Sequence, residues 1–128
     1  MENSKQNANK YDLEKRTLEF ARGVRSFVGR LPRTISNIED GKQLVRSSGS
    51  VGANYIEANE ALSRKDCLMR IKISRKESKE SCYWLELVNV GSNPDLEKER
   101  EELRQEAREF TRMFGSMVEK FKKSKEES

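Results

Sequence analysis

Apolar residues recur four and three positions apart along four stretches of this chain, and this spacing places side chains on one face of an α-helix. The first helix is expected to end before Pro32, because proline pushes the preceding residue out of helical geometry. Helices joined by short connections predict an all-α fold, an antiparallel up-down four-helix bundle. The expected helices span residues 11–31, 38 or 40 to 62, 64 to about 90, and 94 onward.

Capping residues mark the beginnings of the last two helices. Ser63, followed three residues later by Asp66, resembles a capping box. Asn93 before Pro94 combines a capping side chain with a proline at the first helical position. Gly91 is expected to end the third helix. These residues predict helix starts near positions 64 and 94.

The second helix contains an unusual run of small residues, Ser-Ser-Gly-Ser-Val-Gly-Ala at positions 47–53. Serine and glycine are weak helix formers, each costing up to about 1 kcal/mol relative to alanine, so a loop is the competing interpretation. The helix is favoured because the four-and-three spacing continues through the run. The apolar stripe of the third helix also has serine at its centre, at Ser74, Ser78 and Ser81. We therefore expect small residues of the two helices to face each other.

The third helix carries apolar residues on more than one side. Such a helix is usually buried on more than one side, and in so small a bundle this predicts contact with another subunit. Tyr83 and Trp84 could instead stack on nucleic-acid bases, which is the less common role for such aromatics. The candidate oligomer-interface residues are Met69, Ile73, Tyr83, Trp84 and Leu87.

The chain has 128 residues, enough for one domain. Its charged fraction of 38% exceeds its hydrophobic fraction of 34%, as expected for polar ends and long helices with solvated outer faces. We expect a disordered N-terminus over residues 1–10, a bundle over 11–122 and a frayed tail over 123–128. There is no run of about 18 apolar residues and no apolar segment typical of a secretory signal, so a cytoplasmic protein without membrane association is expected.

The chain has no histidine. This excludes Ser-His-Asp and Cys-His nucleophilic sites, histidine-containing zinc sites and the Glu-x-x-His di-iron pattern. Cys67 and Cys82 lie on one helix with about 22 Å of helical rise between them, too far apart for a disulfide. They are expected to be small buried hydrophobes. We expect no enzymatic activity, no cofactor and no metal.

Polar residues on or beside the small-residue helix could form a carboxylate metal site or a network that fixes helix register. The network is favoured because histidine is absent and arginines lie nearby. Its candidate members are Arg46, Asn54, Glu57, Glu77 and Glu80.

The formal net charge is +4, and the basic surplus falls on the first and third helices. Lys72, Lys76 and Lys79 are three or four residues apart on one outer face, where phosphate contacts would be additive and sensitive to salt. From the residues alone, a solvated face partly neutralised by Glu77, Glu80 and Glu86 is the favoured alternative. The candidate nucleic-acid contacts are Arg70, Lys72, Arg75, Lys76, Lys79, Arg22 and Arg25.

Two motif blocks of the second and third helices carry a family resemblance. The blocks are Gln43-Leu44-x-Arg46-Ser47-Ser48-x-Ser50-Val51-x-x-Asn54-x-x-Glu57-Ala58 and Ile71-x-x-x-Arg75-Lys76-Glu77-Ser78-x-Glu80-Ser81-x-Tyr83-Trp84-Leu85. In order and spacing, they resemble a bacterial family of four-helix bundles called ribosomal RNA intervening-sequence proteins. The resemblance covers roughly residues 11–122. Where that family usually has Ile-Ala-Glu-Gly, this chain has Tyr-Ile-Glu-Ala at positions 55–58.

The resemblance implies a fold and an assembly but no reaction, because the family has no established biochemical function. Its members are similar to the accessory protein of diversity-generating retroelements, a basic bundle that forms a five-fold barrel and associates with reverse transcriptase and nucleic acid. The resemblance therefore implies a homopentamer. We expect a non-enzymatic, homo-oligomeric adaptor that associates with RNA or DNA. The alternative is a structural or protein-interaction oligomer that binds a protein partner and no nucleic acid.

Overall fold

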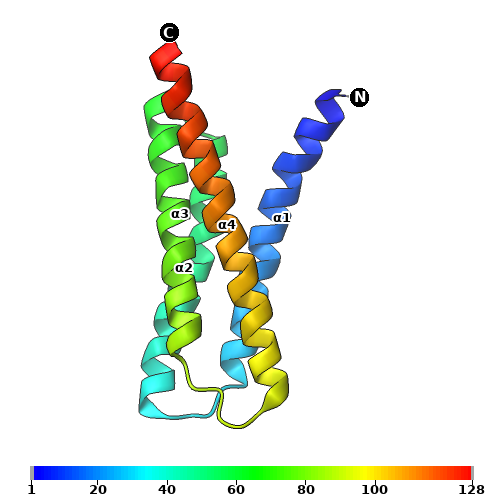
Figure 1. Ribbon diagram of the computed structural model, residues 1–128, viewed down its shortest axis with the longest axis vertical. Coiled ribbons are helices and arrows are strands. Elements are labelled where there is room, and N and C mark those ends of the chain that lie inside the picture. The colour runs from blue at the N-terminus through cyan, green and yellow to red at the C-terminus, as the bar shows by residue number, and fades with distance from the viewer. Residues whose placement is uncertain (1, 128) are drawn as a thin grey trace.

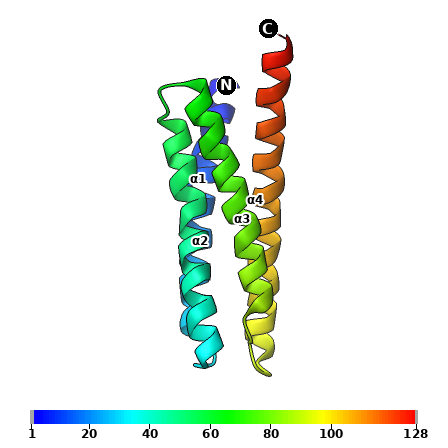
Figure 2. The same cartoon turned by 90° about the vertical axis from the view of Figure 1, so that its left-hand side faces the viewer.

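The computed structural model describes the backbone of residues 2–127 and the side chains of residues 13–124. The chain forms four long helices joined by short connections. Successive helices run in opposite directions, so that α1 begins and α4 ends at the same end of the molecule (Figure 1 and Figure 2). Each helix packs against its neighbours in sequence, and α1 also packs against α4. The predicted all-α four-helix bundle is confirmed. The helices are α1 (Glu2–Gly29), α2 (Ile35–Asn59), α3 (Arg64–Leu87) and α4 (Pro94–Glu127).

The start of α2 differs from the prediction because of a cap that the apolar pattern does not show. α2 begins at Ile35, before the predicted start at residue 38 or 40. The Thr34 hydroxyl accepts a hydrogen bond from the Asn37 backbone N–H at 3.1 Å, which satisfies one of the free donors at the helix start.

Other helix boundaries also differ from the predicted ones. α1 ends at Gly29 and not at residue 31, and α2 ends at Asn59 and not at residue 62. α3 ends at Leu87 and not near residue 90, since the backbone of Val88 is extended with ψ of 148°. α1 begins at Glu2, earlier than the predicted start at residue 11. The predicted disorder of residues 1–10 and fraying of residues 123–128 stay predictions, because the side chains of residues 1–12 and 125–128 lie outside the described part.

The predicted caps of α3 and α4 are confirmed. The Ser63 hydroxyl accepts a hydrogen bond from the Asp66 N–H at 3.1 Å. The Asn93 side-chain oxygen accepts from the N–H groups of Asp95 and Leu96 at 3.0 and 3.2 Å. Both helices therefore begin where local sequence alone places them.

Asn37 joins two connections that lie at the same end of the bundle. Its side-chain amide donates to the carbonyl oxygens of Pro32 at 2.9 Å and Asn89 at 2.8 Å, and its side-chain oxygen accepts from the Asn89 N–H at 2.9 Å. The residue is only 4% exposed. This one side chain holds the α1–α2 connection against the α3–α4 connection.

The core consists of the apolar stripes that the spacing predicts, with phenylalanines at its centre. Phe27, Phe110 and Phe114 are fully buried, and the rings of Phe20 and Phe110 meet edge to face with centroids 5.4 Å apart. The outer faces are strongly polar. Within residues 2–127 no helix has an apolar stretch of the length needed to cross a lipid bilayer.

Small residues line the contact between α2 and α3, as predicted. The hydroxyls of Ser47 and Ser81 share a hydrogen bond of 3.0 Å, and the Ser74 hydroxyl donates to the Val51 carbonyl at 3.0 Å. α2 continues as a helix through residues 47–53, so the alternative interpretation of this run as a loop is wrong. The cost of weak helix formers is offset by close packing that larger side chains would prevent.

Candidate nucleic-acid interface

Lys72, Lys76 and Lys79, which we call the lysine stripe, lie exposed on the outward face of α3. The buried residues Ser74, Ser78 and Ser81 interleave with them in sequence and occupy the opposite side of the helix. Over seven residues the stripe spans about 10 Å of helical rise, so each ammonium group would reach a different phosphate.

The glutamates of α3 do not neutralise the lysine stripe, because arginines of neighbouring helices bind them. Arg46 of α2 donates to Glu77 at 3.2 Å and to Glu80 at 2.8 Å. Arg104 of α4 pairs with Glu86. Among the side chains of residues 13–124, none forms an ion pair with Lys72, Lys76 or Lys79. The three ammonium groups of the stripe are therefore not engaged in ion pairs within the described structure.

The two arginines of α3 that were candidate phosphate contacts are turned toward neighbouring helices. Arg70 is half-buried and donates to the side-chain oxygen of Asn54 at 3.0 Å. Arg75 is also half-buried, and its Cδ lies 3.7 Å from the point where a Cβ at Gly115 of α4 would stand. Their aliphatic stems cover interhelical surface, so the three lysines are more accessible than these two arginines.

Arg22 and Arg25 lie on a different face of the bundle. Both line a groove between α1 and α2, and the Arg25 guanidinium lies beside Gly49 and donates to the Ala21 carbonyl at 3.2 Å. α1 packs against α2 and α4 and not against α3. The structure therefore does not bring these arginines together with the lysine stripe, although the sequence grouped them as one set of contacts.

The candidate polar network falls into two parts in the structure. Arg46 with Glu77 and Glu80 forms one bridge between α2 and α3, and the Asn54–Arg70 hydrogen bond forms a second. Glu57 is exposed, and within residues 13–124 it makes no hydrogen bond to either part. Within the described residues, aspartate, glutamate and cysteine side chains form no cluster that could hold a metal ion.

Three of the candidate interface residues, Met69, Tyr83 and Leu87, share the outward face of α3 with the lysine stripe, whereas Trp84 packs against the core of its own chain. Tyr83 and Leu87 are 57% and 50% exposed, and Met69 is exposed to a similar extent, whereas Ile73 and Trp84 are half-buried. Tyr83 and Trp84 meet edge to face with centroids 5.0 Å apart. The exposed bases of α3 extend from Arg64 to Lys79 with Met69 among them, and Tyr83 and Leu87 follow in the last two turns.

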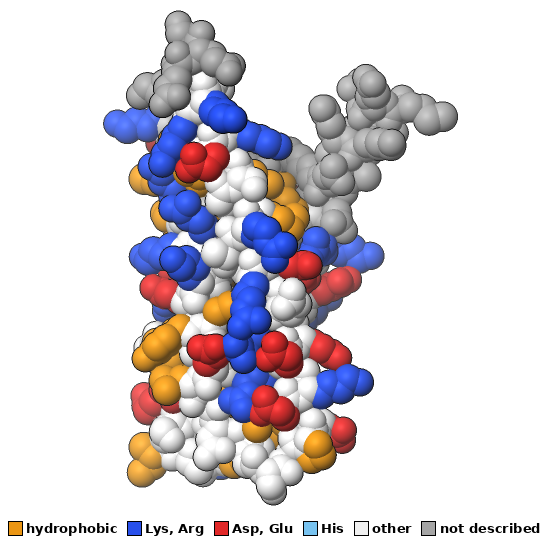
Figure 3. Space-filling view, viewed as in Figure 1, with side chains coloured by type: hydrophobic (Ala, Val, Ile, Leu, Met, Phe, Trp, Pro, Cys, Tyr) orange, Lys and Arg blue, Asp and Glu red, His pale blue; other side chains and the backbone are white. Residues whose placement is uncertain are grey.

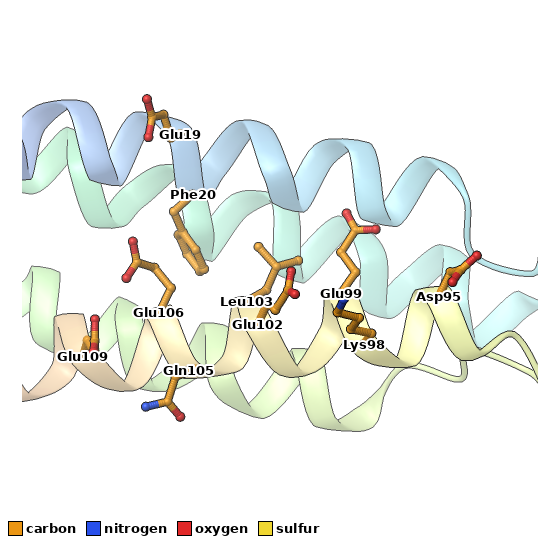
Figure 4. Close-up of a pocket in the computed structure, with 10 residues that line it drawn as sticks. All are labelled: Glu19, Phe20, Asp95, Lys98, Glu99, Glu102, Leu103, Gln105, Glu106 and Glu109. Carbon is orange, nitrogen blue, oxygen red and sulfur yellow. The ribbon is translucent and has the colours of Figure 1, made fainter.

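In Figure 3, charged side chains are unevenly distributed along α3 and α4. Lys and Arg side chains gather toward the end where α4 finishes, and acidic side chains mix with them toward the other end. A hollow of about 670 Å³ between α1 and α4 is lined mainly by carboxylates, among them Glu102, Glu106 and Glu109 (Figure 4). Arg16 pairs with Glu106 and Glu109. A groove of this charge repels phosphate, so the α1–α4 face is unsuited to nucleic acid.

Both cysteines are free thiols, and neither is fully buried. Partial burial raises the pKa of the Cys82 thiol, and its sulfur donates to the Arg104 carbonyl at 3.5 Å. A thiol held protonated is a poor nucleophile. Its position supports a packing role for Cys82.

The sequence did not identify two arrangements that shape this face. Arg104 belongs to the last helix, and nothing in local spacing shows that it pairs with Glu86. Arg64 and Lys65 were not grouped with Lys122, because α3 and α4 meet there only after folding. Aligning the predicted third and fourth helices antiparallel would have placed the start of α3 beside the end of α4, and so Arg64 and Lys65 near Lys122.

Comparisons with known proteins agree on the kind of protein. A family model described as "23S rRNA-intervening sequence protein" matches residues 9–116. A search of curated proteins finds no match. Among solved structures, a protein of unknown function from the S23 ribosomal protein family of Bacteroides thetaiotaomicron is similar, with a TM-score of 0.74 and 27% sequence identity. The alignment covers 86% of this chain and 97% of that one.

Proposed function

The chain belongs to the 23S rRNA-intervening sequence protein family, and we propose that it is a non-enzymatic adaptor that binds nucleic acid through the lysine stripe of α3. The family and the similar solved structure have no known function, so the proposal rests on the molecule itself. We further propose that it self-assembles as a pentamer. We also propose that it acts in the cytoplasm, where it would encounter RNA or DNA.

One observation supports the nucleic-acid role above the others. Glu77, Glu80 and Glu86 form their ion pairs with Arg46 and Arg104, so none of them forms an ion pair with a lysine of the stripe. Neutralising phosphates with free lysines releases counterions, which gives affinity without sequence preference and a strong dependence on salt. An adaptor of this kind needs no catalytic group.

Binding of labelled RNA and DNA, single-stranded and duplex, tests the proposal by fluorescence anisotropy across a salt series. Changing Lys72, Lys76 and Lys79 together to Glu should weaken binding strongly. The slope of log K against log salt should fall by about 2 to 3, near one for each lost phosphate contact. These side chains are exposed, so the helical content measured by circular dichroism should stay the same.

A matched control changes Lys15, Arg33 and Lys42, exposed cations away from α3, to Glu. Both triple variants shift the net charge from +4 to −2, since each replacement removes one positive charge and adds one negative. Only the stripe variant should lose most of its affinity. Equal losses would show that net charge and not the stripe carries the binding.

A structural or protein-interaction oligomer is the second candidate function. It is favoured by the exposed apolar side chains of Met69, Tyr83 and Leu87 on the same face of α3. The two functions separate in one experiment: absence of RNA and DNA binding by the wild-type protein at low salt would leave the second candidate.

A further inference from the structure

A hollow of about 810 Å³ lies between the first turns of α3 and the last turns of α4. Four of the residues that line it are cations, and none of those in the described part is acidic. It lies at the end of the bundle over which basic side chains gather in Figure 3. Lys72 belongs both to this hollow and to the lysine stripe, so the two surfaces are continuous. The cations are Arg64, Lys65, Lys72 and Lys122.

Arg64 is held in place at one wall of this hollow. Its guanidinium carbon lies 4.9 Å from the centre of the Phe121 ring, and the same group donates to the Phe121 carbonyl at 3.1 Å. A planar guanidinium fixed in this way loses little conformational freedom when it binds an anion. Its other N–H groups have no partner among the described side chains.

The remaining cations of the hollow are also largely uncompensated. Within residues 13–124, Lys65 and Lys72 form no ion pair, and Lys122 reaches Glu119 only at 3.7 Å. Like charges gathered around a concave surface raise the local potential and attract an anion with several negative charges. The hollow therefore has the charge and the shape of a phosphate site.

We propose that this hollow binds phosphate groups of a single nucleic-acid strand that continues along the lysine stripe, an inference that rests on the proposed function. A strand that follows both surfaces must turn from the outward face of α3 into the groove between α3 and α4. Duplex DNA has a persistence length of about 50 nm and resists such a turn, whereas a single strand adopts it readily. The inferred ligand is single-stranded RNA or DNA.

The inference is tested by measuring the binding of a fluorescein-labelled oligouridine of about 20 nucleotides to the full chain by fluorescence anisotropy. Changing Arg64 and Lys122 together to Gln should weaken binding several-fold at 100 mM salt. The slope of log K against log salt should fall by about 1.4, since each single-strand phosphate contact contributes about 0.7. The matched control, Arg33 and Lys42 changed to Gln, removes the same charge at the opposite end of the bundle and should leave both values unchanged.

Phe121→Leu tests whether the fixed position of Arg64 matters. This variant keeps every charge but removes the ring that supports the guanidinium. We expect a several-fold loss of affinity with an unchanged salt slope, and circular dichroism to show the same helical content. Wild-type affinity for Phe121→Leu would overturn the role of the ring.

The outcomes separate this inference from the proposed function. If Lys76→Gln with Lys79→Gln weakens binding but the hollow variant does not, the hollow is not a phosphate site and the stripe stands. If only the hollow variant weakens binding, the hollow stands and the stripe is wrong. Equal affinity for duplex and single strand would overturn the single-strand preference.

A further experiment measures the binding of sodium tripolyphosphate to the protein by isothermal titration calorimetry. If the wild-type protein binds no RNA or DNA at 50 mM salt, the proposed function and the nucleic-acid role of the hollow both fall. Tripolyphosphate binding that is lost in the hollow variant would in that case assign the hollow to a free polyphosphate.

Discussion

Several residues of this chain take roles that only their distant partners define. Asn37 is polar and lies next to a helix cap, so its sequence context suggests a solvated side chain. In the fold it is buried and binds Pro32, five residues away, and Asn89, which is 52 residues away, a separation that no local pattern spans. Gly52 likewise is a weak helix former, yet it leaves room for Thr17 of α1, whose hydroxyl would lie 2.6 Å from a Cβ at this position.

Asn37→Ala should destabilise the protein by about 3 kcal/mol, because it removes three hydrogen bonds and leaves buried backbone groups of the two connections unpaired. Thermal unfolding followed by circular dichroism should show a fall in Tm of about 10 °C. Asn59→Ala, which removes one part-buried hydrogen bond to Glu14, should cost under about 1 kcal/mol. Equal effects of the two variants would contradict the role assigned to Asn37.

Gly52→Ala and Gly49→Ala should have opposite effects on the free energy of unfolding. A Cβ at Gly52 would stand 2.6 Å from the Thr17 hydroxyl, which is buried and fixed by hydrogen bonds to the Leu13 and Glu14 carbonyls. The strain should outweigh the gain in helix propensity and cost about 1 to 2 kcal/mol.

At Gly49 the nearest atom is the flexible Arg25 guanidinium at 3.5 Å, so alanine should stabilise by up to about 1 kcal/mol. Urea denaturation measures both changes. In a Thr17→Ala background the penalty at Gly52 should shrink, because the clashing hydroxyl is gone. A stabilising Gly52→Ala in the wild-type background would show that α1 shifts at little cost.

At the scale of helices, the sequence predicted the features that depend on residues close together in the chain, namely the core faces and the helix starts. Apolar spacing placed the core faces, and the side chains of Ser63 and Asn93 placed two helix starts, because these signals lie within one or two turns. Pairing between helices was predicted only in part. The Arg46 bridge to Glu77 and Glu80 was expected, whereas Arg104 binding Glu86 was not, because it depends on the register between α3 and α4.

This pairing changes the interpretation of α3. From the sequence, a solvated and partly neutralised face was the favoured reading of its lysines. Once Arg46 and Arg104 are seen to bind the glutamates, that alternative loses its main support, and the lysine stripe becomes an accessible row of positive charge. Whether nucleic acid binds it stays a proposal for the salt series to decide.

At the scale of the whole molecule, the outward face of α3 is divided along its length. The lysine stripe ends at Lys79, and the last two turns carry Tyr83 and Leu87. This division would allow one helix to serve two partners, with the apolar end against another copy of the chain and the lysine stripe facing nucleic acid. A ring of copies would present several stripes to one strand, so a modest patch would gain affinity through multivalency.

Tyr83→Ser with Leu87→Ser tests the assembly that this argument requires. Size-exclusion chromatography with light scattering should give about five times the 14.9 kDa chain mass for the wild-type protein and a smaller species for the variant. The matched control, Leu18→Ser with Ile56→Ser, removes apolar side chains of similar exposure from the α1–α2 face and should leave the mass unchanged.

Both residues of the α3 pair are half-exposed, so helical content should survive in the variant and a loss of mass would report assembly and not unfolding. A measured mass equal to that of a single chain for the wild-type protein would contradict the proposed oligomer, and with it the gain in affinity through multivalency. RNA binding would then have to come from one lysine stripe alone, at an affinity near that of non-specific contacts.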